Sequence, residues 1–91
     1  MTAGDAIEMI APGTASMEAI VASVAEVAAV PVAEIMGTSR LRKVARARQL
    51  AMWHGRQAGL TLGQIGQYLN RDHTSVLNGV RRIEQLMKDL K

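Results

Sequence analysis

The chain has 91 residues, the length of one small domain with a modest core. Hydrophobic residues make up 48% of it and aromatic residues only 2%, so the core must be built from Ala, Val, Ile, Leu and Met, which favours helices. The absence of cysteine excludes disulfides, cysteine-based zinc fingers and thiol catalysis.

Charge is divided unevenly along the chain. Residues 1–38 contain five acidic and no basic residues, a net charge of −5, whereas residues 39–91 contain all 11 basic residues and three acidic ones, a net charge of +8. Such a basic half predicts a polyanionic partner, with nucleic acid the leading class and an anionic membrane surface the second.

No segment is expected to span a membrane. The longest apolar stretch, residues 20–35, is interrupted by Glu26 and Glu34 and is not preceded by a basic residue. This pattern fits neither a transmembrane helix nor a signal peptide, and it predicts a cytoplasmic protein.

The N-terminal residues predict an arm followed by a helix. Residues 1–13 are rich in Gly and Ala and end in Pro-Gly, which indicates a flexible arm ahead of a single domain at 14–91. A helix is expected to begin at Thr14 or Ser16, either of which can cap it. Its apolar stripe comprises Met17, Ile20, Val21, Val24, Val27 and Ala28.

Pro31 separates this helix from a second one. The first helix is expected to end near Val30, because proline disfavours helix at the residue before it. A short helix is then predicted at 32–36, with Pro31 at its start and Gly37 closing it in the left-handed conformation.

A basic loop at 38–43 precedes a third predicted helix at 44–58, which Gly59 ends. The inward stripe of this helix is expected to comprise Val44, Ala47, Leu50, Ala51, and His54 or Trp53. The arginines are expected on its other faces: Arg42, Arg46, Arg48 and Arg56.

The C-terminal part predicts two helices joined by a short turn. Thr61 and Gln64 form a capping-box pattern at the start of a helix at 62–68. A tight connection leads to Asp72, which is expected to cap a last helix at 73–90. That helix carries an apolar seam: Val76, Val80, Ile83, Met87 and Leu90. Every expected element is helical, so the predicted fold class is all-α, a small bundle containing a helix-turn-helix.

Four polar side chains fill the first turn of the last helix: Asp72, His73, Thr74 and Ser75. In a helix-turn-helix this turn enters the major groove, where such side chains can read base edges. Capping explains Asp72 equally well, but it does not explain the arginines nearby. Neighbours on one helical turn splay apart and cannot form a nucleophile–base–acid relay, so no enzyme activity, metal or cofactor is expected.

Several runs resemble the C-terminal DNA-binding domain of the bacterial replication initiator DnaA. The resemblance extends from about Met17 to Met87 and implies a Trp-repressor-like helix-turn-helix fold. The most specific run is Asn70-Arg-Asp-His-Thr-Ser-Val76. The others are Val44-Ala-Arg-Ala-Arg-Gln-Leu-Ala-Met-Trp53, Leu62-Gly-Gln-Ile-Gly66 and Arg82-Ile-Glu-Gln-Leu86.

The resemblance also implies site residues. The bases of an asymmetric DnaA box would be read in the major groove by Asp72, His73, Thr74 and Ser75, and its A·T-rich end in the minor groove by Arg40 in the basic loop. Phosphate contacts would fall on Arg42, Arg48, Gln49, Arg56 and Arg82.

The chain departs from the family pattern at Ala47, where proline is common, and at His54, where an aliphatic residue is usual. The sequence contains no Gly-x-x-x-x-Gly-Lys-Ser/Thr loop, so neither a bound nucleotide nor an ATP-driven step is expected in this chain.

The expected function is sequence-specific binding of double-stranded DNA at DnaA-box-like sites, in control of replication initiation or transcription. The protein would occupy or compete for the sites of the full-length initiator, or act as a transcription factor of a phage or mobile element, or be a truncated gene product. The alternative is a protein-interaction module whose acidic half docks a partner and whose basic half is only a solvated face. The polar first turn favours the DNA hypothesis.

Overall fold

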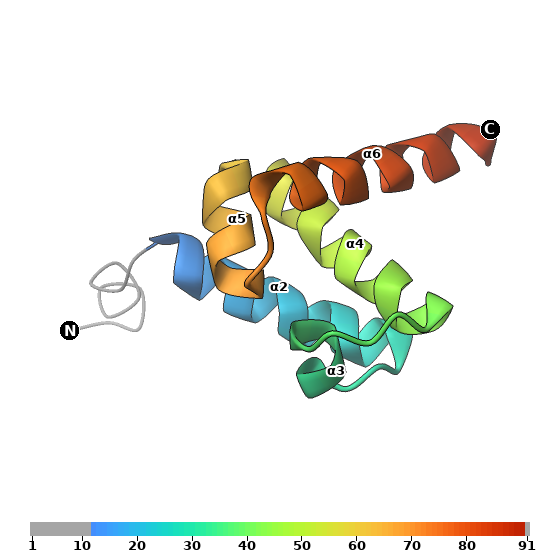
Figure 1. The fold of residues 1–91 in the computed structure, drawn as a ribbon, viewed down its shortest axis with the longest axis horizontal. Coiled ribbons are helices and arrows are strands. Elements are labelled where there is room, and N and C mark those ends of the chain that lie inside the picture. Colours follow the sequence, from blue (N-terminus) through green and yellow to red (C-terminus); the bar gives the residue numbers. More distant parts are fainter. Residues whose placement is uncertain (1–11, 91) are drawn as a thin grey trace.

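Helices account for every regular element that the computed structural model describes, from residue 12 to residue 90, with side chains from residue 16 (Figure 1). No strand occurs within that range, and the all-α prediction is confirmed. Most of the predicted arm, residues 1–11, lies outside the described residues. The elements are α2 (Pro12–Ala28), α3 (Val32–Met36), α4 (Arg42–Gln57), α5 (Leu62–Leu69) and α6 (His73–Asp89).

Helix α4 is the central element. It packs against each of the other four helices, most extensively against α6 and α2. Figure 1 shows α2 and α6 on opposite sides of α4, and α5 closes one end of the bundle by contacting both α2 and α6. The predicted helix-turn-helix, α5 and α6, is therefore supported by α4 and α2.

The core is aliphatic, as the composition requires. Its largest fully buried side chains come from four of the five helices and comprise Met17, Val21, Ile35, Ile65, Leu69 and Val76. On α6 the predicted seam is confirmed as far as Ile83 and is wrong beyond it, because Met87 is 37% and Leu90 is 87% exposed. The last turns of α6 project past α4 in Figure 1, which explains their exposure.

Three helices end in the same C-terminal motif, in which one residue adopts a left-handed conformation and the next N–H bonds to a carbonyl five residues earlier. The left-handed residues are Ala29 (φ 55°), Gly59 (φ 92°) and Asn70 (φ 55°). The hydrogen bonds run from Val30 to Ala25 (3.1 Å), from Leu60 to Gly55 (3.1 Å) and from Arg71 to Gly66 (2.8 Å). The predicted role of Gly59 is confirmed.

The short helix α3 has the predicted bounds but not the predicted end. Gly37 is extended (φ −90°, ψ −158°), so a left-handed closure by this glycine is wrong. The Gly37 N–H bonds to the Glu34 carbonyl at 3.2 Å, which closes a single turn without reversing the chain.

Helix boundaries differ from the predicted ones by one or two residues, except at the start of α2, which precedes Thr14 by two residues and Ser16 by four, so both predicted cap residues lie inside the helix. Helix α2 begins at Pro12 and ends at Ala28, where the left-handed Ala29 stops it before Val30. Helix α4 begins at Arg42 rather than Val44, because the Ala45 N–H already bonds to the Leu41 carbonyl at 2.8 Å.

The buried face of α4 is wider than the predicted stripe, because this helix is covered by α2 on one side and α6 on the other. Arg48 is buried, which contradicts its predicted outward position, and His54 is exposed rather than inward. The buried residues of α4 are Val44, Ala47, Arg48, Ala51, Met52 and Gly55, while Leu50 and Trp53 are half-buried.

The capping box of α5 is confirmed. The Gln64 N–H donates to the Thr61 hydroxyl at 3.0 Å, and the Thr61 N–H donates to the Gln64 side chain at 2.9 Å. Helix α5 extends one residue further than predicted, to Leu69, and α6 stops one residue earlier, at Asp89. In the part of the chain that the structure describes, no helix has the length and apolarity needed to cross a membrane.

Candidate nucleic-acid interface

The first turn of α6 presents its polar side chains to solvent. Asp72 occupies the N-cap position, yet its carboxylate makes no capping hydrogen bond. It lies 3.0 Å from Nδ1 of His73, and the two side chains are 67% and 69% exposed. Thr74 and Ser75 are also exposed. The capping hypothesis for the Asp72 side chain is therefore wrong, and all four groups are accessible to a ligand.

The exposed face of α6 extends beyond the predicted site residues. Asn78 follows Thr74 by four positions and Arg81 by seven, which places all three on one side of the helix. Both additional residues are exposed, whereas the opposite side carries the buried Val76, Val80 and Ile83. Neither Asn78 nor Arg81 was among the predicted site residues, although their spacing from Thr74 was a usable signal.

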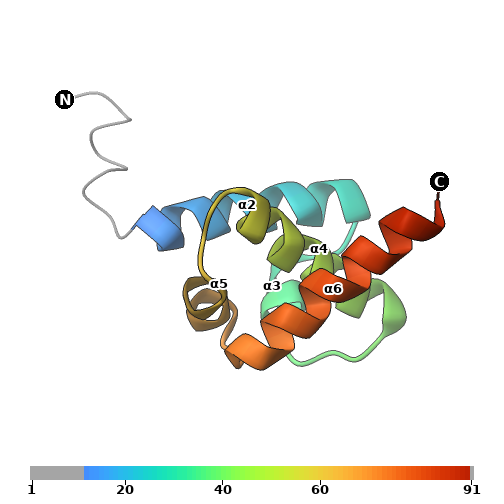
Figure 2. The ribbon, with the colours of Figure 1, turned by 90° about the horizontal axis from the view of Figure 1, so that it is seen from above.

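The loop that carries Arg40 lies on the same side of the molecule as the start of α6. In Figure 2, the chain between α3 and α4 and the beginning of α6 both lie along the lower edge. Arg40 is exposed, and the Leu41 N–H donates to the Ser39 hydroxyl at 3.3 Å. Arg71, next to the start of α6, donates from Nη2 to the Gly37 carbonyl and so connects the two segments.

Arg48, on α4, anchors this loop through hydrogen bonds to its backbone and to that of α3. Its guanidinium donates to four backbone carbonyl oxygens, which belong to Ile35 (2.8 Å), Ser39 (3.2 Å), Glu34 (3.0 Å) and Gly37 (3.1 Å). Burial, and secondarily the charge of Arg71, lower the pKa of Arg48 from its ordinary value. With these bonds made, one of its five N–H groups remains for the predicted phosphate contact.

The other predicted phosphate-binding residues are spread over α4 and α6. Arg42 and Arg82 are exposed. Gln49 is half-buried and accepts a hydrogen bond from Arg46 Nη1 at 3.0 Å. Arg56 is exposed, and its Nη1 donates to the Leu60 carbonyl at 2.6 Å. Since α4 rises about 1.5 Å per residue, Arg42 and Arg56 lie near opposite ends of it and do not form one cluster.

A polar hollow of about 430 Å³ lies between α4 and α6. It brings together two of the predicted phosphate contacts on α4, the turn before α6, and the exposed residues Ser75 and Arg82. Its lining consists of Ala45, Arg48, Gln49, Met52, Arg71, Ser75, Asn78, Gly79 and Arg82. Three arginines and several amide or hydroxyl groups suit this hollow to an anion.

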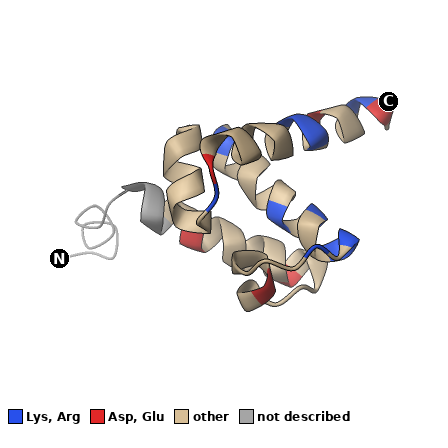
Figure 3. Cartoon of the chain, viewed as in Figure 1, with Lys and Arg blue, Asp and Glu red and all other residues tan. Residues whose placement is uncertain are grey.

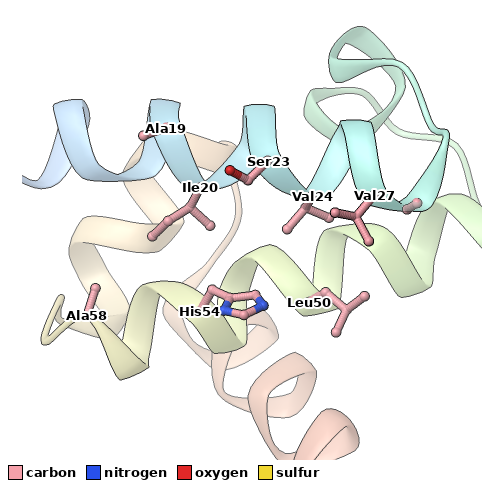
Figure 4. A pocket seen from close by; sticks show the side chains of 9 residues that line it. Ala19, Ile20, Ser23, Val24, Val27, Leu50, His54 and Ala58 are labelled. Atoms are coloured by element: carbon pink, nitrogen blue, oxygen red, sulfur yellow. The ribbon is translucent and has the colours of Figure 1, made fainter.

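A second hollow, of about 510 Å³, lies on the other side of α4, against α2 (Figure 4). Its lining is mostly aliphatic and includes Ile20, Val24 and Leu50, with His54 at its floor. The His54 ring meets the Trp53 ring edge-on, with centroids 5.0 Å apart. None of the predicted DNA-binding residues lines this hollow.

Charge separates by element as well as by sequence. Figure 3 shows the acidic residues of α2 and α3 on one part of the molecule, and most basic residues on α4, α6 and the loop before α4. The basic elements are the ones that carry the polar first turn and Arg40. A field of this shape attracts a polyanion towards that side.

The comparisons with known proteins agree on one family. The protein-family model described as "Bacterial dnaA protein helix-turn-helix" matches residues 17–83, which include the whole buried part of α6. The chain is 40% identical to the chromosomal replication initiator protein DnaA of Cereibacter sphaeroides over 74 residues, which cover 79% of this chain and 16% of that protein.

Two further relatives carry the same printed name. The chain is 42% identical to the protein of Ruegeria sp. (strain TM1040) over 73 residues (78% of this chain, 16% of that protein). It is 44% identical to the protein of Thermomicrobium roseum over 61 residues (65% of this chain, 13% of that protein). The chain thus spans 16% or less of the length of these relatives. No solved structure matches it significantly.

Proposed function

The chain belongs to the bacterial DnaA helix-turn-helix family, and on this premise we propose that it binds double-stranded DNA sequence-specifically at DnaA-box-like sites. DNA binding itself follows from the family, whose matched region is a helix-turn-helix and not a catalytic domain. The choice of site and the biological role are the proposed part.

One observation carries the proposal: the exposed first turn of α6 and the loop of Arg40 lie on the same side of the molecule. His73, Thr74 and Ser75 would read base edges in the major groove, with Asp72 accepting from a cytosine amino group. Arg40 would enter the adjacent minor groove, where an A·T-rich sequence concentrates negative potential. Two grooves read at once define an asymmetric site.

Backbone contacts would set the register. The exposed Arg42, Arg56 and Arg82 are the strongest candidates, with Gln49 and the remaining N–H of Arg48 at the polar hollow. These contacts supply affinity that does not depend on sequence.

We place this binding in the cytoplasm, in control of replication initiation or transcription. The 91 residues contain no phosphate-binding loop for ATP. A chain of this kind would occupy initiator boxes and compete with the full-length initiator for them, without itself driving a nucleotide-dependent step.

The test is a pair of fluorescence anisotropy titrations, with a box-containing duplex and with a scrambled duplex of equal composition. The Thr74→Ala variant should lose about 1–3 kcal/mol of discrimination between them. Ser23→Ala is the matched control, because it removes an exposed hydroxyl from α2, on the far side of α4. Equal binding of both duplexes by the unmodified protein would contradict the proposal.

The alternative, a protein-interaction module, is favoured only by the aliphatic hollow of Figure 4, whose lining includes Val27 with 88% of its surface exposed. The lining of that hollow selects no particular partner. The polar turn of α6 and the basic loop, in contrast, match the chemistry of DNA. DNA binding is therefore the better supported function.

A further inference from the structure

Arg71 is a half-buried arginine in the turn of the helix-turn-helix. It stands between Asn70, the left-handed residue that ends α5, and Asp72, the N-cap residue of α6. Its N–H donates to the Gly66 carbonyl at 2.8 Å, and its Nη1 donates to the Leu69 carbonyl at 3.1 Å. The turn of the helix-turn-helix therefore fixes both the backbone and the side chain of Arg71.

The same guanidinium also contacts a residue outside the turn. Its Nη2 donates to the carbonyl of Gly37, which lies 34 residues earlier, at the start of the loop that carries Arg40. This bond directly joins the loop to the residue that precedes the N-cap of α6. Gly37 is thus tied to the start of the segment that carries His73, Thr74 and Ser75.

Two cations share this one acceptor. Arg48 Nη2 also donates to the Gly37 carbonyl, at 3.1 Å. Two guanidinium groups this close repel each other, so their arrangement costs electrostatic energy. Arg48 alone already anchors the loop to α4 through the carbonyls of Glu34, Ile35 and Ser39. The additional bond from Arg71 therefore serves to relate the loop to α6 rather than to α4.

We propose that Arg71 is a positioning residue, which holds the loop of Arg40 at a fixed distance from the first turn of α6 and so sets the spacing at which the two grooves of the DNA are read. This inference rests on the proposed function. It concerns the geometry between the two reading segments, and it does not require Arg71 to contact a base.

The free protein supplies the first test, which needs no DNA. In ¹⁵N relaxation measurements, the amides of residues 38–41 should lose order in Arg71→Gln, with order parameters falling from roughly 0.85 towards 0.6. Arg81→Gln is the matched control. The side chain of Arg81 is exposed, and it makes no hydrogen bond to any of the described residues. The control should leave the loop unchanged. Equal loop order in both variants would overturn the proposal.

The second test inserts one base pair between the A·T-rich end of the box and the part read by α6. The unmodified protein should bind the inserted duplex roughly tenfold more weakly, because Arg40 loses its site. In Arg71→Gln this penalty should fall below about threefold, and combining it with Arg40→Ala should change it no further.

Arg71→Lys separates positioning from a phosphate contact. Lysine keeps the charge but lacks the planar fork that donates to the Leu69 and Gly37 carbonyls together. The positioning role predicts that the insertion penalty stays low in Arg71→Lys, while overall affinity is largely kept. A penalty restored to the unmodified value would overturn the proposal. If the unmodified protein fails to prefer the box at all, the proposed function is wrong, and the relaxation test still decides the role of Arg71.

Discussion

A single buried arginine supports the loop that carries Arg40. Arg48 is 7% exposed, and its bonds to four carbonyls join α3 and the following loop to α4. Arg48→Met keeps the length of the side chain but leaves those carbonyls without a donor. We expect it to lower the free energy of unfolding by about 2–4 kcal/mol, measured by urea denaturation.

Arg81→Met provides the comparison for this variant, since Arg81 is exposed on α6. It should change stability by less than about 0.5 kcal/mol. Similar stability of the two variants would mean that the Arg48 bonds contribute nothing to the stability of the fold. A phosphate contact would then be the one role still proposed for Arg48.

The sequence could not have shown this role of Arg48. The sequence shows that Arg48 lies close to Ala47 and Ala51 on the predicted helix, but an arginine is normally expected on an exposed face. Its acceptors lie 9 to 14 residues away, in α3 and in the following loop, whose path no local pattern determines. The exposure of the four residues proposed to read bases in the major groove was easier to predict, because they form one continuous run at a helix start.

At the level of elements, α2 ends with an unfavourable residue in a well-formed motif. Ala29 adopts φ 55°, where α4 has Gly59 and α5 has Asn70. An alanine in the left-handed conformation destabilises the folded protein by roughly 1–2 kcal/mol. Glycine removes this strain, but it also increases the conformational entropy of the unfolded chain, which offsets part of the gain. We expect Ala29→Gly to raise the free energy of unfolding by about 0.5–1 kcal/mol, with a higher Tm in calorimetry. A lower Tm would show that the motif is not formed in solution.

The turn between α5 and α6 depends on a close backbone approach at Gly66. A Cβ atom there would collide with the Arg71 carbonyl oxygen, which is backbone and cannot rotate away. We expect Gly66→Ala to destabilise the protein by about 2–3 kcal/mol in chemical denaturation.

Gly63, in the first turn of the same helix, offers the matched control. A Cβ atom at that position meets only the Thr61 hydroxyl, at 3.9 Å. Gly63→Ala should therefore be neutral or stabilising, by up to about 1 kcal/mol. The prediction fails if the two alanine variants unfold at the same denaturant concentration.

Elements with local signals were predictable, and elements that depend on distant contacts were not. The capping box of Thr61 and the stop at Gly59 involve neighbouring residues, and both are confirmed. The extent of the α6 seam depends on how far α4 reaches beside it, so exposure of Met87 and Leu90 could not be inferred from their spacing. The two-residue error at the start of α4 has a similar origin, since Arg42 and Lys43 are compatible with either helix or loop.

For the whole molecule, the division of charge along the sequence becomes a division in space. The elements from the loop of Arg40 onward carry the basic residues, and α2 and α3 carry acidic ones. An acidic side on a DNA-binding domain disfavours binding in the wrong orientation, because like charges repel. The sequence predicted the sign of each half, but only the packing of α2 against α4, on the side opposite α6, shows that the acidic residues of α2 lie away from the start of α6.

Salt should weaken DNA binding steeply but less steeply than a count of all basic residues suggests. Under the proposed function, the phosphate backbone would be approached by four exposed arginines, Arg40, Arg42, Arg56 and Arg82. Arg48 is buried and engaged with carbonyls, so it displaces few counterions. Four contacts give a slope of log affinity against log salt concentration of about −3 to −4.

In the same titration, Arg42→Gln should flatten this slope by about one unit, for box and scrambled duplexes alike. A slope shallower than about −2 for the unmodified protein would instead favour the protein-interaction alternative, because a merely solvated basic face neutralises few phosphates.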